Sequence, residues 1–266
     1  MNKDEIFNRL WRDYAAENPS AGAIHALFRN RGNRVLNDHV AFRTFDHPRV
    51  SIDVLARPFI DSGYVRAGEY FFEDKQLKAA HFEHPDPLAP LVFISELLTG
   101  SFSPFLQQTV SSLVGNLPGE ALHPSRILFS GKFMEHPSYA VYEQLRTESE
   151  YAGWLYVFGF RANHFTVSVN HLDTFDSLQE VNAFLKANGH ALNSSGGEIK
   201  GTPDQLLEQS STLADRVLVQ FEEGLKEIPS CYYEFARRYT GPDGRLFRGF
   251  IARSADKIFE STDYRR

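Results

Sequence analysis

Hydrophobic residues recur at helical spacing over the first thirty positions of the chain. The recurring positions are Ile6, Leu10, Tyr14, Ile24, Leu27 and Phe28. Side chains three or four residues apart lie on the same face of a helix, and Pro19 interrupts the pattern between the two groups. Residues 1–35 are therefore predicted to form a helical cap.

From residue 36 the pattern changes to short apolar runs and alternations typical of strands. We expect a strand, a helix and three further strands, over residues 38–45, 50–62, 64–72, 77–83 and 91–94. This order defines a first βαβββ module over residues 36–95.

A comparable order returns in the last hundred residues. We expect a strand over 163–170, a helix over 177–187 and strands near 216–221 and 231–238. After the turn at 241–244, a hairpin strand over 246–252 is expected to close the sheet. Residues 163–266 are thus predicted to form a second module with a C-terminal hairpin, and residues 96–162 a helical insertion between the modules. The chain is interpreted as one α+β catalytic domain, 1–266.

Composition and charge narrow the class of partner. The 266 residues include 28 Lys and Arg against 34 Asp and Glu, for a net charge of −6, and 42% are hydrophobic. No basic run is longer than Arg265-Arg266, which argues against nucleic acids and anionic membranes, and no uncharged stretch is apolar enough to span a bilayer. Cys231 has no partner for an intramolecular disulfide, and the N-terminus lacks the apolar run of a signal peptide. We expect a cytoplasmic protein that binds small molecules.

Several familiar catalytic motifs are missing. No two glycines are two residues apart, which excludes the dinucleotide-binding loop. Arg126 replaces the upstream glycine that a Walker loop ending at Gly131-Lys132 requires. Glycines four apart enclose Leu117 and Ile199 rather than serine, so the nucleophile elbow of serine hydrolases is absent. The remaining candidate chemistry lies in the ten histidines.

Most of the histidines are poor candidates for a rigid metal site. Four precede proline, which favours turns and element ends, and surface roles suffice for two others. The six are His47, His84, His123, His136, His25 and His190. His39, His81, His164 and His171 remain on or beside predicted strands.

The alternation of side chains along a strand indicates which of these four histidines could act as ligands. His164 shares a face with Thr166 and Ser168, and this polar face either meets solvent or lines a wet cavity with His164 as a ligand. His39 and Arg43 share a face about 13 Å apart, at about 3.3 Å per residue. That spacing suits a metal ligand and a guanidinium holding opposite parts of one anionic substrate. The alternative is a strand histidine beside an exposed arginine.

Two further groups compete for a role in the site. His81 lies near Glu83 and is ranked below His39. Glu234 stands among aromatic strand formers, where an unpaired charge would be costly. Either a neighbouring arginine, Arg237 or Arg238, or a divalent cation could neutralise it. Two histidines and one carboxylate with open positions suit non-haem Fe(II) and oxygen chemistry.

Four motifs in this order resemble the 2-oxoadipate dioxygenase/decarboxylase family, iron enzymes of the vicinal-oxygen-chelate superfamily. The motifs are Asp38-His39-Val-Ala-Phe-Arg43-Thr-Phe45, Asn163-His164-Phe-Thr166, Gln209-Ser-Ser-Thr-Leu-Ala-Asp215 and Tyr232-Tyr-Glu234-Phe-Ala-Arg-Arg238. The resemblance covers residues 36 to 263, most of the chain. The chain is shorter than the long members of the family, which leaves the exact dicarboxylate open.

The resemblance implies a half-barrel in which His39, His164 and Glu234 bind Fe(II) and Arg43 binds a substrate carboxylate. Glu96 is then a candidate fourth ligand, although a filled fourth position would leave less room for substrate and oxygen.

The implied reaction consumes dioxygen and converts 2-oxoadipate to 2-hydroxyglutarate and CO2, a step of lysine catabolism. Arg253 and Ser254 are assigned to the opposite end of the substrate pocket. The alternatives are a zinc or manganese isomerase or hydrolase on the same scaffold, and a binder of small molecules without catalytic activity. The oligomeric state is not predicted.

Overall fold

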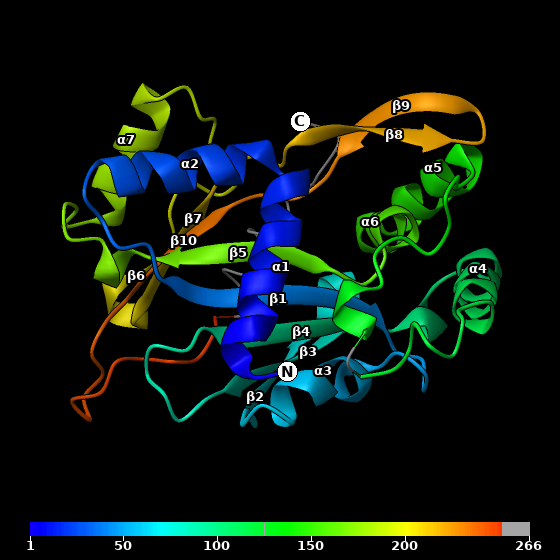
Figure 1. Cartoon of the computed structure of the whole chain (residues 1–266), viewed down its shortest axis with the longest axis horizontal. Coiled ribbons are helices and arrows are strands. Elements are labelled where there is room, and N and C mark those ends of the chain that lie inside the picture. Colours follow the sequence, from blue (N-terminus) through cyan, green and yellow to red (C-terminus); the bar gives the residue numbers. More distant parts are fainter. Residues whose placement is uncertain (125, 252–266) are drawn as a thin grey trace.

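The computed structural model describes residues 1–124 and 126–251 and contains one curled sheet of eight strands (Figure 1). The strands follow the order β2-β3-β4-β1-β5-β10-β7-β6. Their bounds are β1 Asn37–Phe45, β2 Val65–Phe72, β3 Leu77–Glu83, β4 Leu91–Leu97, β5 Ala162–Ser168, β6 Lys200–Thr202, β7 Leu207–Ser211 and β10 Glu234–Arg238. The predicted α+β half-barrel with a helical cap and a helical insertion is confirmed.

The two halves of the sheet repeat one topology. In the first half the chain runs β1, helix α3 (Ile52–Ile60), β2, β3 and β4, and β4 returns to lie parallel to β1. In the second half it runs β5, helix α7 (Leu178–Ala187), β6, β7 and β10, and β10 lies parallel to β5. The first strands of the two halves pair antiparallel at the centre. The repeat predicted from the sequence is therefore present in the strand order.

The second half differs from the prediction in which strands build it. Residues 216–221 form β8 (Arg216–Phe221), which pairs only with β9 (Gly224–Pro229) in a separate two-stranded sheet. The positions expected for β8 in the main sheet are taken by β6 and β7, which the sequence analysis did not predict. β7 reads Leu-Glu-Gln-Ser-Ser and is buried throughout, with Gln209 bonded to Glu234 on the concave face and Ser210 bonded to Asn182 of α7 on the outer face.

The predicted C-terminal hairpin is also wrong within the described residues. Only a single bridge, between Thr240 and Leu246, forms after the turn, and residues 247–251 belong to no strand. Arg238 donates hydrogen bonds to the carbonyl oxygens of Phe247 and Gly249, so these oxygens are not used in strand pairing. Residue 252 lies outside the described residues.

Helices cover the outer face of the half-barrel. Helix α1 (Lys3–Glu17) crosses the sheet, and α2 (Pro19–Asn30) follows it (Figure 1). Trp11 of α1 packs on Phe165 of β5, with ring centroids 5.2 Å apart, and Phe42 of β1 packs on Phe59 of α3 at 5.5 Å. Burying these rings stabilises the packing of the helices on this face. The apolar alternate residues of β1 and β5 therefore point outward to the helices.

The insertion gathers at one end of the sheet, where Figure 1 shows α4, α5 and α6 side by side. These helices span Pro104–Gly115, Tyr139–Glu148 and Glu150–Phe158. Short 3-10 turns lie at Glu73–Lys75, Thr99–Ser101, Ile127–Phe129, Val169–His171 and Pro203–Gln205. Helix α6 contacts the end of β1, so the insertion borders the concave face.

Candidate metal site

Three adjacent strands place His39, His164 and Glu234 on the concave face of the sheet. His39 of β1 and Glu234 of β10 both pair with Thr166 of β5, one from each side. His164 lies two residues before Thr166 and points to the same face. Pairing in the sheet therefore brings together side chains that are 125 and 70 residues apart in the sequence.

The ligand atoms of the three side chains converge. His164 Nε2 lies 3.2 Å from Glu234 Oε2 and 3.4 Å from His39 Nε2, and His39 Nε2 lies 3.7 Å from Glu234 Oε1. All three residues are buried, and their ligand atoms lie within 4.8 Å of one another. Ligands held about 2.1 Å from one ion are separated by roughly 3.0–3.4 Å at ordinary coordination angles. The observed spacing is close to this range.

Each of the three side chains is oriented by a polar neighbour. His39 Nδ1 lies 2.8 Å from Asp38 Oδ1, and His164 Nδ1 lies 3.2 Å from Asn163 Oδ1. Gln209 Nε2 donates to Glu234 Oε1 at 2.6 Å. We call His39, His164 and Glu234 the triad. A hydrogen held on Nδ1 leaves the Nε2 lone pair of each imidazole directed at the centre of the triad.

One buried oxygen atom of the triad lacks a hydrogen-bond partner. Among the described residues, Glu234 Oε2 accepts no hydrogen bond, although it faces His164 Nε2. The Thr166 hydroxyl lies 3.1 Å from His39 Nε2, and the Nε2 lone pairs of the two histidines face each other at 3.4 Å. A divalent cation between the three side chains would satisfy all of these atoms at once, so the residues present fit a metal ion.

The pKa shifts of Glu234 and His164 are consistent with a site that binds a metal ion. Burial raises the pKa of the Glu234 carboxyl, against the opposing effects of His39 and the Gln209 hydrogen bond. Burial, followed by the charges of His39 and Arg43, holds the pKa of His164 well below its ordinary value. His164 is therefore neutral at physiological pH, the form that binds metals.

Arg43 lies on the same face of β1 as His39 and is held by the insertion. Its guanidinium is 2% exposed, and Nη1 lies 3.1 Å from Glu150 Oε1 at the start of α6. The guanidinium carbon also lies 4.9 Å from the centre of the Tyr151 ring and 5.2 Å from that of Trp154. The alternative of an exposed arginine is wrong, because α6 buries this side chain.

The other sequence candidates lie outside the triad. His81 binds the Tyr70 hydroxyl and Glu83, at 2.9 Å and 3.2 Å. Glu96 accepts a hydrogen bond from the backbone N–H of Ile52 at the start of α3. Neither residue belongs to the metal-binding group found among residues 1–124 and 126–251. Arg253 and Ser254 fall outside the described residues.

Sequence reasoning did not single out the residues that orient the ligands. Asp38 and Asn163 each directly precede a histidine of the triad, and this repeated polar-His pair was the available signal. Gln209 lies in the unpredicted strand β7. Tyr232 was also missed: its ring stacks on that of His164, with centroids 4.8 Å apart.

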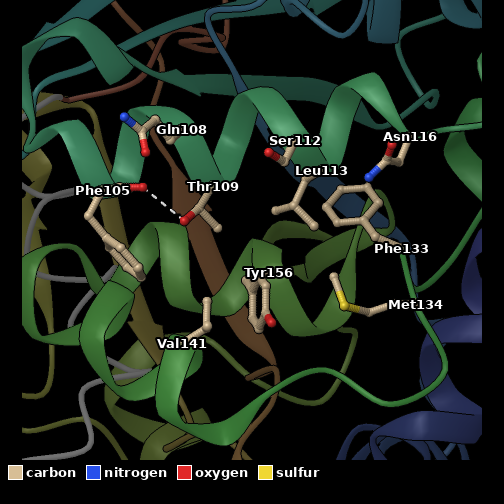
Figure 2. A pocket seen from close by; sticks show the side chains of 10 residues that line it. All are labelled: Phe105, Gln108, Thr109, Ser112, Leu113, Asn116, Phe133, Met134, Val141 and Tyr156. Atoms are coloured by element: carbon tan, nitrogen blue, oxygen red, sulfur yellow. Dashed lines mark hydrogen bonds between the residues drawn. The ribbon is translucent and has the colours of Figure 1, made fainter.

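A separate cavity of about 520 Å³ lies within the insertion (Figure 2). One wall is a face of α4 that includes Thr109 and Leu113, and Val141 and Tyr156 lie opposite. Its lining contains no Asp, Glu, His, Lys or Arg. The candidate chemistry therefore lies in the half-barrel and not in this cavity.

A family model described as 2-oxoadipate dioxygenase/decarboxylase matches residues 127–247. A protein of that name from Oryza sativa subsp. japonica, chloroplastic/amyloplastic, is 37% identical over 283 residues, covering 97% of this chain and 78% of the relative.

Two crystal structures are also closely similar. The rice hydroxyglutarate synthase in complex with 2-oxoadipate has a TM-score of 0.91 and 35% identity, and the match covers 98% of this chain and 91% of that one. A protein from Shewanella frigidimarina described as a hydrolase has a TM-score of 0.90 and 49% identity, with 94% and 98% covered.

The sequence predicts that no segment spans a membrane. Within the part of the chain that the structure describes, no helix has both the length and the apolar character needed to cross a bilayer.

Proposed function

Because the chain belongs to the 2-oxoadipate dioxygenase/decarboxylase family, we propose that it converts 2-oxoadipate and O2 to 2-hydroxyglutarate and CO2 with Fe(II) as cofactor. The observation that carries this proposal is the buried group of His39, His164 and Glu234. The rice relative solved with 2-oxoadipate supports the substrate class. The protein acts as a single catalytic domain over residues 1–266.

The metal is held by two imidazoles and one carboxylate, from His39, His164 and Glu234. When bound, Fe(II) would coordinate the 2-oxo acid and activate dioxygen. No protein nucleophile is required, which agrees with the missing serine motifs.

Arg43 binds a substrate carboxylate. A guanidinium offers two parallel N–H groups to a carboxylate, and the rings of Tyr151 and Trp154 restrict its orientation. Because the side chain is buried, this contact is made out of bulk water and orients the substrate relative to the triad. The assignment of Arg253 and Ser254 to the other end of the pocket stays a prediction.

A zinc- or manganese-dependent hydrolase is the second candidate. The name of the Shewanella frigidimarina relative, at 49% identity, favours it. The ligand set itself suits either class of metal, since two histidines and a carboxylate also form hydrolytic zinc sites. The cytoplasmic location and the role in lysine catabolism stay predictions.

An oxygen-uptake assay separates these functions. The metal-free protein is loaded anaerobically with Fe(II) or Zn²⁺ and given 2-oxoglutarate, 2-oxoadipate, 2-oxopimelate or 2-oxohexanoate. We expect the iron form to consume one O2 for each CO2 released with a dicarboxylate, and far less with 2-oxohexanoate, which lacks the second carboxylate. The absence of uptake with every 2-oxo acid, together with hydrolysis by the zinc form, would contradict the proposal.

A further inference from the structure

A short segment of the chain, residues 247–250, crosses the concave face beside the triad. We call it the strap. The ring of Phe250 lies 4.9 Å from the ring of His39, edge to face, and 4.9 Å from the ring of Phe93, measured between centroids. It also contacts His81 at 5.4 Å. The strap therefore covers one side of the metal-binding histidine.

Arg238 is the main anchor of the strap. Its Nη1 donates to the carbonyl oxygens of Gly249 and Phe247, at 2.8 Å and 3.2 Å. Its guanidinium also lies over the Phe250 ring, 5.2 Å from the centroid. The side chain of Arg238 is 4% exposed, so these bonds are made in a nearly dry environment.

The same guanidinium binds Asp38 with its other edge. Arg238 Nε donates to Asp38 Oδ2 at 2.7 Å, and Nη2 donates to Oδ1 at 2.9 Å. Burial alone would raise the pKa of Asp38, but Arg238 and His39 together lower it, so the carboxylate stays charged. Arg238 thus pairs directly with Asp38, and its charge acts on Glu234 only as a smaller effect that lowers the pKa of that carboxyl.

Asp38 in turn orients His39. Its Oδ1 accepts from His39 Nδ1 at 2.8 Å, which directs Nε2 toward His164 and Glu234. A carboxylate on the far nitrogen of a metal-binding histidine fixes the ring and increases its basicity. A continuous path therefore runs from the strap through Arg238 and Asp38 to the ligand atom.

We propose that Arg238 is a positioning residue that couples closure of the strap to metal binding by His39. The proposal rests on the metal site of the proposed function. A bound metal fixes the His39 ring, against which Phe250 packs, and the closed strap fixes Arg238, which holds Asp38 against His39. Each event is then more favourable once the other has occurred, and the coupling acts equally in both directions.

A second anchor allows the coupling to be tested away from the ligands. Arg248 Nε donates to Glu83 Oε2 at 2.7 Å, and the Phe250 backbone N–H donates to the Tyr70 hydroxyl at 3.1 Å. Arg248 is 29% exposed, so replacing it is compatible with folding. Loosening the strap at this anchor leaves the Arg238–Asp38–His39 contacts in place.

The experiment measures Mn²⁺ affinity and hydrogen exchange. Mn²⁺ suits oxygen and nitrogen ligands and serves as the probe, with its dissociation constant obtained by competition with a chelator. Exchange of the backbone amides of residues 246–251 reports closure of the strap.

The variants are Arg238→Lys, which keeps the charge but loses the forked geometry, and Arg248→Gln. Arg237→Lys is the matched control, because Arg237 adjoins Arg238 on the opposite face of β10.

We expect Mn²⁺ to slow exchange of the strap in the parent. Arg238→Lys should weaken Mn²⁺ binding by about 10- to 100-fold and remove this protection. Arg248→Gln should weaken binding by about fivefold, and Arg237→Lys should change it by less than about twofold. Melting temperatures establish that each variant is folded.

Two results would overturn the proposal. If Arg238→Lys weakens binding but Arg248→Gln does not, Arg238 acts on His39 alone and the strap is not coupled. If both variants bind Mn²⁺ as the parent does, Arg238 does not position the ligand. A His39→Ala variant distinguishes these failures from a wrong metal site, because unchanged Mn²⁺ binding in that variant would remove the proposed function as well.

Discussion

Replacing His39 and Glu234 together with alanine is expected to remove both the bound metal and the activity. The two side chains supply two of the three ligand atoms of the triad, and one remaining imidazole does not hold a divalent ion in a stable site. Because a metal ion contributes several kcal/mol of transition-state stabilisation, activity should fall at least about a thousandfold. Metal content of the purified protein and oxygen uptake with 2-oxoadipate measure the two losses.

A matched double variant controls for nonspecific damage. Glu135→Ala with His136→Ala also removes one carboxylate and one imidazole, but both residues are exposed. This control should keep its metal and its activity. The parent and the control should melt at a higher temperature when Mn²⁺ is added, and the His39/Glu234 variant should not respond. Iron retained at the parental level in the His39/Glu234 variant would remove the proposed site.

Arg43→Lys is expected to raise KM for a 2-oxo dicarboxylate by about 10- to 100-fold, which corresponds to the loss of one charge-assisted hydrogen bond or two. Lysine keeps the positive charge beside Glu150 but lacks the planar fork and its stacking on Tyr151 and Trp154. Metal content should not change. Steady-state kinetics together with metal analysis measure both quantities.

The control for this substitution is Arg66→Lys. Arg66 also binds carboxylates, those of Asp53 and Glu69, but it is 35% exposed and lies on β2, the edge strand of the sheet. It should leave KM unchanged. Parental kinetics in Arg43→Lys would show that the arginine serves only to pack α6 against β1.

β1 and β5 could be predicted because apolar and polar side chains alternate along them. β1 and β5 place residues such as Phe42 and Phe165 toward the helices and their polar residues toward the concave face, so the alternation in the sequence matches the two faces of the sheet. β7 was missed because its side chains are mostly polar although both of its faces are buried, with Gln209 against Glu234 and Ser210 against Asn182 of α7. β8 has the composition of a strand, and local composition does not specify which sheet a strand joins.

The candidate site, too, could be predicted only in part from local sequence patterns. Alternation placed His39 and Arg43 on one face, and the resemblance to a known family supplied the combination with His164 and Glu234. The contacts of Arg43 with α6 and of Arg238 with Asp38 join elements that are more than 100 residues apart. Such pairs depend on the register of the sheet and the packing of the insertion, which a single sequence does not reveal.

Anomalous X-ray scattering from a crystal of the protein loaded with Fe(II) under anaerobic conditions tests the central claim most directly. Data collected on both sides of the iron absorption edge should give one strong difference peak, about 2.0–2.2 Å from the Nε2 atoms of His39 and His164 and from a Glu234 carboxylate oxygen. A peak at any other place, or no peak between these three side chains at full iron loading, would contradict the account.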